Sequence, residues 1–303
     1  MEILYWLESI RVPVLNEFML LITKFGEETL FLVAALTILW CSDKRRSYYL
    51  LAVGFLGLIG NQFLKLLFRI PRPWVQDKNF TILEQAREAA SGYSFPSGHT
   101  QTAVGTFGSI AYTTKNRVVK YLCVAICILV PISRMYIGVH TPLVVTVAAA
   151  IAVLLIYFLK PITGAKSDRW MPWILSAMVL CAVAFWAYVE YFPFPADIDA
   201  HNYASGISNA YKFLGAIIGF AIVYIVDENW LHFEVKAVWW AQALKVAIGF
   251  LLVLAVKSGL KAPINALVGA EVGSAVRYFL IVLVAGILWP LSFKFFKRLG
   301  NKG

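Results

Sequence analysis

Basic residues, a histidine or both occur at three places in the first half of the sequence. Arginine can chelate a tetrahedral oxyanion through its planar fork of donors, and a helix N-terminus offers free amides to an anion. Two histidines can divide the roles of nucleophile and proton donor between them. Together these groups predict a site that binds phosphate and carries out chemistry on it. The residues concerned are Lys65, Arg72, Ser97, His99, Arg134 and His140.

The first place is KLLFRIPRP, which starts at Lys65 and places Arg72 seven residues later. Two helical turns cover about 7.2 residues, so both side chains project from a similar face if the helix continues that far. Pro71 and Pro73 are expected to end the helix here, because proline lacks the amide donor and restricts the residue before it. The simpler alternative is that both cations extend to the membrane interface.

The other two places also allow a simpler interpretation when each is taken alone. YSFPSGHT, with Pro96 and Gly98 as turn residues, can be an ordinary helix start that carries a histidine by chance. His140 can be an interfacial residue with one hydrogen bond. All three places map to the same membrane face, however, and this combination favours a site over three unrelated residues.

No carboxylate cluster accompanies these residues, so the sequence offers no ligands for a two-metal mechanism. The four cysteines lie in or beside apolar runs, with neither the spacing of a zinc site nor that of a disulfide framework. They are expected to be buried small apolar residues. The pattern thus predicts a metal-free phosphatase that needs no cofactor.

The remainder of the sequence predicts membrane-spanning helices that hold these residues. Hydrophobic residues make up 60% of the chain and charged residues 15%, a composition that is rare in soluble domains. A span needs about 20 mostly apolar residues, and the chain is therefore predicted to be an all-α polytopic membrane protein. The clearest candidate spans are Tyr48–Phe68, Val118–Ile132, Leu143–Leu159, Trp173–Val189, Ala210–Val226, Val238–Val256 and Val276–Phe293.

The basic residues give a topology. Short loops rich in lysine and arginine stay in the cytoplasm, which accounts for the net charge of +10 without a nucleic-acid partner. This gives roughly nine spans, with the N-terminus outside, the C-terminus inside and the candidate site on the extracytoplasmic side of the cell membrane. The loop 227–236, placed inside, lacks a positive excess. The basic clusters are Lys44–Arg46, Lys115–Lys120, Lys160–Arg169 and Lys294–Lys302.

Three parts of the chain are distinguished by composition. Residues 1–26 mix apolar residues with charges and are expected to form an amphipathic interfacial segment rather than a removable signal peptide. Residues 27–160 hold the candidate site and are expected to form the catalytic core. Residues 161–303 are expected to contribute the C-terminal transmembrane helices.

The three motifs resemble those of the type 2 phosphatidic acid phosphatase (PAP2) superfamily. KLLFRIPRP resembles Lys-x6-Arg-Pro, FPSGH resembles Pro-Ser-Gly-His, and SRMYIGVH resembles Ser-Arg-x5-His, over roughly residues 45–160. The resemblance implies a PAP2-type helical bundle with the site at its extracytoplasmic end. It implies that Lys65, Arg72 and Arg134 bind phosphate oxygens with help from Ser97 and the Gly98 amide. It also implies that His140 forms a phosphohistidine and that His99 protonates the leaving group.

One position departs from the family pattern, which usually continues as His-x3-Asp. Val144 stands where that acid would orient His140, and loss of a comparable acid in a serine protease costs about 10⁴ in turnover. Three interpretations stay open. Another residue or a backbone carbonyl orients the histidine, the activity is weak, or Val144 is an inactivating substitution.

The substrate is predicted to be a lipid phosphate or a prenyl diphosphate that reaches the site from the surrounding membrane lipids. Alternatives are a glucose-6-phosphatase-like sugar phosphatase, a lipid phosphotransferase, a catalytically weak lipid-binding or transport homologue and, remotely, a vanadate-dependent halide oxidant. The segment FPFPADIDAHNYASG, with Asp197, Asp199 and His201, either covers the site or is a solvated connection.

Overall fold

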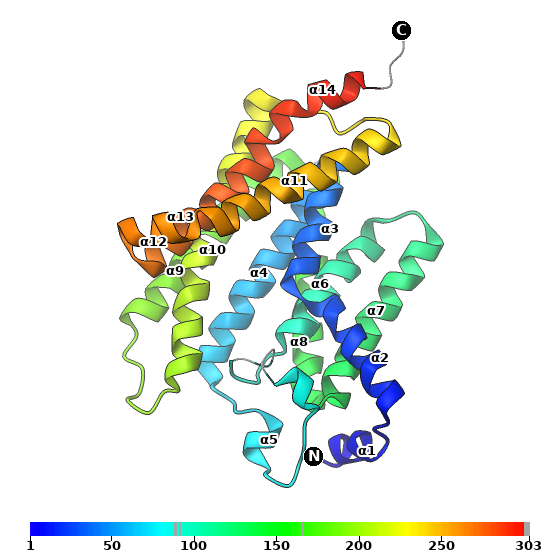
Figure 1. The fold of residues 1–303 in the computed structure, drawn as a ribbon, viewed down its shortest axis with the longest axis vertical. Coiled ribbons are helices and arrows are strands. Elements are labelled where there is room, and N and C mark those ends of the chain that lie inside the picture. The colour runs from blue at the N-terminus through cyan, green and yellow to red at the C-terminus, as the bar shows by residue number, and fades with distance from the viewer. Residues whose placement is uncertain (88–89, 91, 165–166, 300–303) are drawn as a thin grey trace. The chain divides into compact units, whose positions relative to one another are not determined.

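The computed structural model describes residues 1–87, 90, 92–164 and 167–299. The secondary structure in these residues is entirely helical, in agreement with the predicted all-α fold (Figure 1). The α-helices are α1 (Glu2–Ser9), α2 (Pro13–Thr23), α3 (Glu28–Cys41), α4 (Lys44–Phe68), α5 (Pro73–Gln76), α6 (Gly98–Thr113), α7 (Arg117–Tyr136), α8 (Pro142–Phe158), α9 (Ser167–Tyr191), α10 (Ala200–Val226), α11 (Trp239–Gly259), α12 (Lys261–Val268), α13 (Ala270–Leu283) and α14 (Phe293–Arg298).

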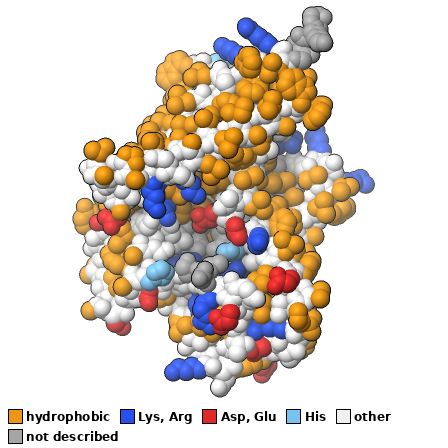
Figure 2. All heavy atoms as spheres, viewed as in Figure 1, with side chains coloured by type: hydrophobic (Ala, Val, Ile, Leu, Met, Phe, Trp, Pro, Cys, Tyr) orange, Lys and Arg blue, Asp and Glu red, His pale blue; other side chains and the backbone are white. Residues whose placement is uncertain are grey.

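The chain is a polytopic membrane protein. Six helical segments among the described residues are long and apolar enough to cross a bilayer, and many hydrophobic side chains lie on the face shown in Figure 2. Helices α3 and α8 are apolar but shorter. The count of nine spans stays a prediction, because it also requires these two helices and the more polar α6. The six segments are Lys44–Gln76, Arg117–Tyr136, Ser167–Tyr191, Ala200–Leu231, Trp239–Val268 and Ala270–Arg298.

The helices form two compact units, and every candidate site residue lies in the first. This unit comprises Met1–Ala34, Tyr49–Lys166 and Pro195–Ser205. Helix α6 packs against both α7 and α8 within it. Most of the first three turns of α6 are buried, and small residues such as Ala103 and Gly105 allow the neighbouring helices to approach closely.

Capping residues determine where the helices beside the site begin. Ser97 precedes α6, and its Oγ accepts a hydrogen bond from the amide of Thr100 at 3.4 Å. Asn116 precedes α7, and its Oδ1 accepts from the next two amides at 2.9 and 3.2 Å. Pro142 occupies the first turn of α8, where its missing amide hydrogen costs nothing. These starts place Ser97 and the residues before Pro142 at helix ends.

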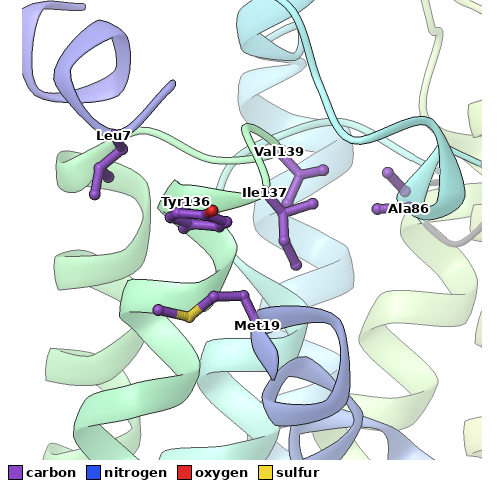
Figure 3. Packing of buried hydrophobic residues seen from close by; sticks show 7 residues of the cluster. Leu7, Met19, Ala86, Tyr136, Ile137 and Val139 are labelled. Carbon is purple, nitrogen blue, oxygen red and sulfur yellow. The ribbon is translucent and has the colours of Figure 1, made fainter. Parts of the chain in front are cut away.

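The N-terminal helices α1 and α2 support the end of α7. Leu7 and Met19 pack in one buried cluster with Tyr136, Ile137 and Val139, as Figure 3 shows. The segment predicted to be interfacial is thus two short helices that each contribute buried residues to the first unit. This packing fixes the chain immediately before His140.

The second unit comprises Ala35–Tyr48, Ser167–Phe194 and Gly206–Gly303. Within it, α11 packs against α13 and α14. Its polar centre is the buried carboxylate of Asp227, which accepts hydrogen bonds from Lys44 Nζ at 2.9 Å and from Tyr48 Oη at 2.8 Å. An ion pair of this kind satisfies a charge that would otherwise be costly in an apolar surrounding.

Candidate active site

Lys65 and Arg72 do not share a helical face, because the helix does not continue to Arg72, although both side chains reach one site. Helix α4 ends at Phe68, Arg69 adopts a left-handed conformation with φ of 49°, and Arg72 precedes α5. The helix ends before Pro71, as its proline-rich continuation predicted. A bend in the chain, rather than two further helical turns, therefore brings Arg72 back toward Lys65.

The segment 92–94 holds both cations in place. Lys65 Nζ donates to the carbonyl oxygen of Tyr93 at 2.6 Å, and Arg72 Nε donates to that of Gly92 at 3.1 Å. Gly92 has φ of 77°, a left-handed conformation that glycine adopts without strain. Both cationic side chains are buried, with exposed fractions of 7% and 6%. A chain segment far from α4 in sequence thus aligns the two cations.

The Pro-Ser-Gly-His turn is anchored from two sides. Asn61 of α4 donates through Nδ2 to the carbonyl oxygen of Pro96 at 3.3 Å. On the other side, Gly26 packs directly on His99, because a Cβ added to this glycine would lie 2.6 Å from the His99 carbonyl oxygen. Ser97 is buried at the start of α6, and Gly98 is its first residue. The free amides of this helix start are therefore held in a fixed position.

Arg134 lies in the last turn of α7, with an exposed fraction of 2%. Its Nη1 donates to Thr23 Oγ1 of α2 at 2.7 Å, while its Nε has no hydrogen-bond partner among the described residues. The guanidinium is thus fixed at one nitrogen and keeps at least one donor for a ligand. A buried cationic donor without a partner is costly and favours the binding of an anion.

His140 lies between α7 and α8 and is 1% exposed. Its Nε2 is 3.1 Å from Arg72 Nη1, and its Nδ1 is 3.4 Å from Ser94 Oγ. Burial, reinforced by the charges of Arg72, Arg134 and Lys65, holds the pKa of His140 well below its ordinary value. The imidazole is therefore neutral near pH 7 and able to act as a nucleophile.

The site has an excess of positive charge. Within the described part of the chain, neither Lys65 nor Arg134 forms an ion pair with a carboxylate. The described part of the chain also contains no group of three or more His, Cys, Asp and Glu side chains able to hold a metal ion. An anionic ligand would compensate the buried cations.

Val144 occupies the first turn of α8 and is 3% exposed. Its apolar side chain offers no acceptor to His140, as its sequence position indicated. No local pattern selects Ser94, Asn61 or Thr23, although these residues contact the site motifs directly. The only signal was that Ser94 stands two residues before the Pro-Ser-Gly-His motif.

The segment Pro195–Ser205 belongs to the same unit as the site. The backbone amide of Asp199 donates to the hydroxyl oxygen of Tyr93 at 3.4 Å, next to the carbonyl that holds Lys65. Asp197 and His201 are exposed. The segment therefore contacts the strip of chain that holds the two cations, and the choice between a cover and a solvated connection stays a prediction.

Comparisons with known proteins match both units. Residues 45–168 match the family described as the PAP2 superfamily, and residues 211–302 match the PAP2 superfamily phosphatase transmembrane extension. The undecaprenyl-diphosphatase BcrC of Bacillus subtilis (strain 168) is 30% identical over 144 residues, which cover 47% of this chain and 72% of that protein. No solved structure matches the chain. On these matches the chain belongs to the PAP2 superfamily of membrane phosphatases.

Proposed function

We propose that the chain hydrolyses a prenyl diphosphate, or another lipid phosphate, through a phosphohistidine formed on His140. The reaction takes place at the extracytoplasmic face and needs no metal ion. The observation that carries this proposal is the position of His140 Nε2, 3.1 Å from the Arg72 guanidinium in a site with two further buried cations. A phosphate bound by these cations would stand beside a neutral nucleophilic nitrogen.

The residues divide the reaction into two steps. In the first, His140 Nε2 attacks phosphorus, the P–O bond to the leaving group breaks, and His99 gives a proton to the departing oxygen. Lys65, Arg72 and Arg134 stabilise the charge that spreads over the phosphoryl oxygens, together with Ser97 and the Gly98 amide at the start of α6. In the second, water attacks phosphorus, the P–N bond breaks, and His99 takes up the proton of the water.

Prenyl diphosphate is the preferred substrate class because of the relative named above. The match to that undecaprenyl-diphosphatase includes 47% of this chain. A buried site in a chain with six apolar helical segments also suits a substrate held in the bilayer. Phosphate release from a panel of substrates, described below, distinguishes among the lipid headgroups.

The charges at the ends of α7 and α8 support the extracytoplasmic location. Arg117 and Lys120 lie in the first turn of α7, and Arg134 lies in its last turn. Helix α8 follows His140 and leads to Lys160 at its far end. Since exposed lysines and arginines favour the cytoplasmic side, the opposite ends, which carry the site, face outward.

The test is phosphate release by the full-length protein in detergent with EDTA. The panel contains undecaprenyl diphosphate, phosphatidic acid, phosphatidylglycerol phosphate and glucose 6-phosphate. We expect release to be fastest from the prenyl diphosphate and to be abolished in His140→Ala. Release from glucose 6-phosphate alone would overturn the substrate class, and a phosphorylated acceptor without free phosphate would indicate a transferase. Vanadate binding without any phosphate release would indicate a non-catalytic phosphate receptor. The valine at position 144, in place of the family acid, is the observation that favours this alternative.

A further inference from the structure

We propose that Ser94 is the positioning residue for His140 and fulfils the role of the acid that Val144 replaces. This inference rests on the proposed function of His140 as the nucleophile. Ser94 Oγ lies 3.4 Å from Nδ1, on the opposite side of the ring from the nitrogen that attacks phosphorus. The hydroxyl accepts a hydrogen bond from Nδ1–H and thereby keeps the lone pair on Nε2.

The contacts at the two ring nitrogens determine the tautomer. A guanidinium has donors and no acceptor, so the Arg72 Nη1 contact at 3.1 Å requires a lone pair on His140 Nε2. The neutral ring then carries its proton on Nδ1. At an exposed fraction of 1%, the ring has little access to bulk water, and the group within hydrogen-bonding distance of Nδ1 is Ser94 Oγ. The observed contacts therefore favour the tautomer that nucleophilic attack requires.

The other groups that act on His140 offer no carboxylate to Nδ1. The charges that influence it are those of Arg72, Arg134, Lys65 and His99, and none of them is a carboxylate. Val144, one helical turn along the chain, has an aliphatic side chain. Among the described residues, the acceptor found at this nitrogen is the serine hydroxyl, which both accepts and donates hydrogen bonds.

Ser94 is itself held firmly. It is 1% exposed, and its amide donates to the carbonyl oxygen of Ile70 at 2.7 Å. The two residues before it offer the carbonyl oxygens that hold Lys65 and Arg72. One short segment thus aligns the phosphate-binding cations through its backbone and the nucleophile through its side chain. This arrangement links the orientation of His140 to the position of the bound phosphate.

A neutral hydroxyl is a weaker partner for a developing imidazolium than a carboxylate is. We therefore expect Ser94→Ala to lower kcat with a prenyl diphosphate by about tenfold, far less than the loss of a triad acid. KM should stay within about twofold, because the phosphate-binding cations are unchanged. Ser94→Thr keeps the hydroxyl and should retain most of the activity. Ser109→Ala removes another buried serine, near the C-terminal end of α6, and is the matched control.

The decisive comparison adds an acid at the family position. Val144→Asp should restore kcat in the Ser94→Ala background, because a carboxylate one turn from His140 can accept the same hydrogen bond from Nδ1–H. Inhibition by inorganic vanadate should be similar in all variants that fold. Unchanged kcat in Ser94→Ala, an equal loss in Ser94→Ala and Ser94→Thr, or an effect on KM alone would each overturn the proposal.

A readout independent of turnover separates this inference from the proposed function. The chain has four histidines, so 15N-histidine NMR of the full-length protein in micelles, compared with His140→Ala, identifies the His140 signals. We expect a protonated Nδ1 and an unprotonated Nε2 in the parent, and a mixture of tautomers in Ser94→Ala. The same spectrum in both proteins would refute the role of Ser94 even if the parent releases no phosphate. If the parent releases no phosphate but Ser94→Ala still changes the tautomer of His140 as expected, the positioning role would be supported and only the hydrolase function refuted.

Discussion

A single nitrogen of Arg72 contacts both His140 and the residue before it. Nη1 lies 3.1 Å from His140 Nε2 and donates to the Val139 carbonyl oxygen, also at 3.1 Å. The contact to Nε2 occupies the lone pair that would attack phosphorus. A bound phosphate oxygen is a stronger acceptor than a neutral imidazole, so we expect substrate binding to draw the guanidinium away from Nε2 and to free its lone pair.

Arg72→Lys tests this relationship. Lysine keeps the charge but cannot bind the phosphate, the backbone carbonyls and the imidazole with one rigid fork. We expect kcat/KM for a prenyl diphosphate to fall by about 10²- to 10³-fold, as for the loss of one transition-state donor. Steady-state kinetics with EDTA provide the measurement, and Arg87→Lys, at an exposed position paired with Glu84, is the control. A loss below about threefold would contradict the role of the fork.

Val144→Asp should change the pH dependence in a defined direction. Burial and the neighbouring cations lower the pKa of His140 in the parent, so the acid limb of kcat/KM should lie below about pH 6.5. A carboxylate favours the imidazolium, raises the pKa of His140 and should move that limb to higher pH. Val144→Asn adds polarity without charge and should leave the limb unmoved. Since ionisation of the substrate is common to all three proteins, coincident limbs would contradict this assignment.

The Thr23 hydroxyl should matter for Arg134. Thr23→Val removes the acceptor at 2.7 Å while keeping the shape of the side chain. Without it the guanidinium has more freedom, and we expect kcat/KM to fall by about tenfold and vanadate binding to weaken. Thr23→Ser keeps the hydroxyl and should behave as the parent does. Equal kinetics in the valine and serine variants would show that the hydrogen bond has no effect on phosphate binding.

Gly26→Ala should disturb His99. The added methyl group would lie 2.6 Å from the His99 carbonyl oxygen and 2.7 Å from its Cβ, which forces one of the two segments to move. We expect a loss of about 1–3 kcal/mol in stability, as for an overpacked core, and a lower kcat. Gly164→Ala, which meets no atom within 4 Å, should have neither effect. Thermal unfolding in detergent and kcat for both variants decide the question, and a fully active, stable Gly26→Ala would refute the close contact.

The topology can be tested with single cysteines in a background without the four native ones. Asp197→Cys should react in intact bacterial cells with a maleimide that cannot cross the membrane, because its segment is assigned to the outside. Lys115→Cys, in a basic loop, should react only after the cells are opened. The reverse pattern would place the active site in the cytoplasm.

The helices and the motif residues could be predicted from the sequence because a local pattern of residues indicates each of them. Long apolar runs form helices in lipid, where the backbone must satisfy its own hydrogen bonds. Ser97 and Pro142 mark helix starts by residue type. The approach of Arg72 to the site of Lys65 was not predictable, since the chain leaves the helix at Phe68 and returns by an irregular path.

The supporting contacts are long-range and leave no local signal. Thr23 meets Arg134 across 111 residues of sequence, and Ser94 meets His140 across 46. A buried threonine or serine can satisfy its hydroxyl in many ways, so its type does not identify its partner. Only the packing of the unit shows that these hydroxyl groups hold the arginine and the histidine.

The central claim, that His140 carries the phosphoryl group, can be tested without knowing the natural substrate. If the reaction with inorganic phosphate is reversible, attack by Nε2 forms the N–P bond, releases one oxygen as water and later takes one back. The full-length protein in detergent, with EDTA and inorganic phosphate in 18O-labelled water, should therefore transfer 18O into phosphate, as mass spectrometry would detect. We expect exchange in the parent and none in His140→Ala. Equal exchange in the two proteins, or no exchange in a parent that binds vanadate, would contradict a phosphohistidine at this residue.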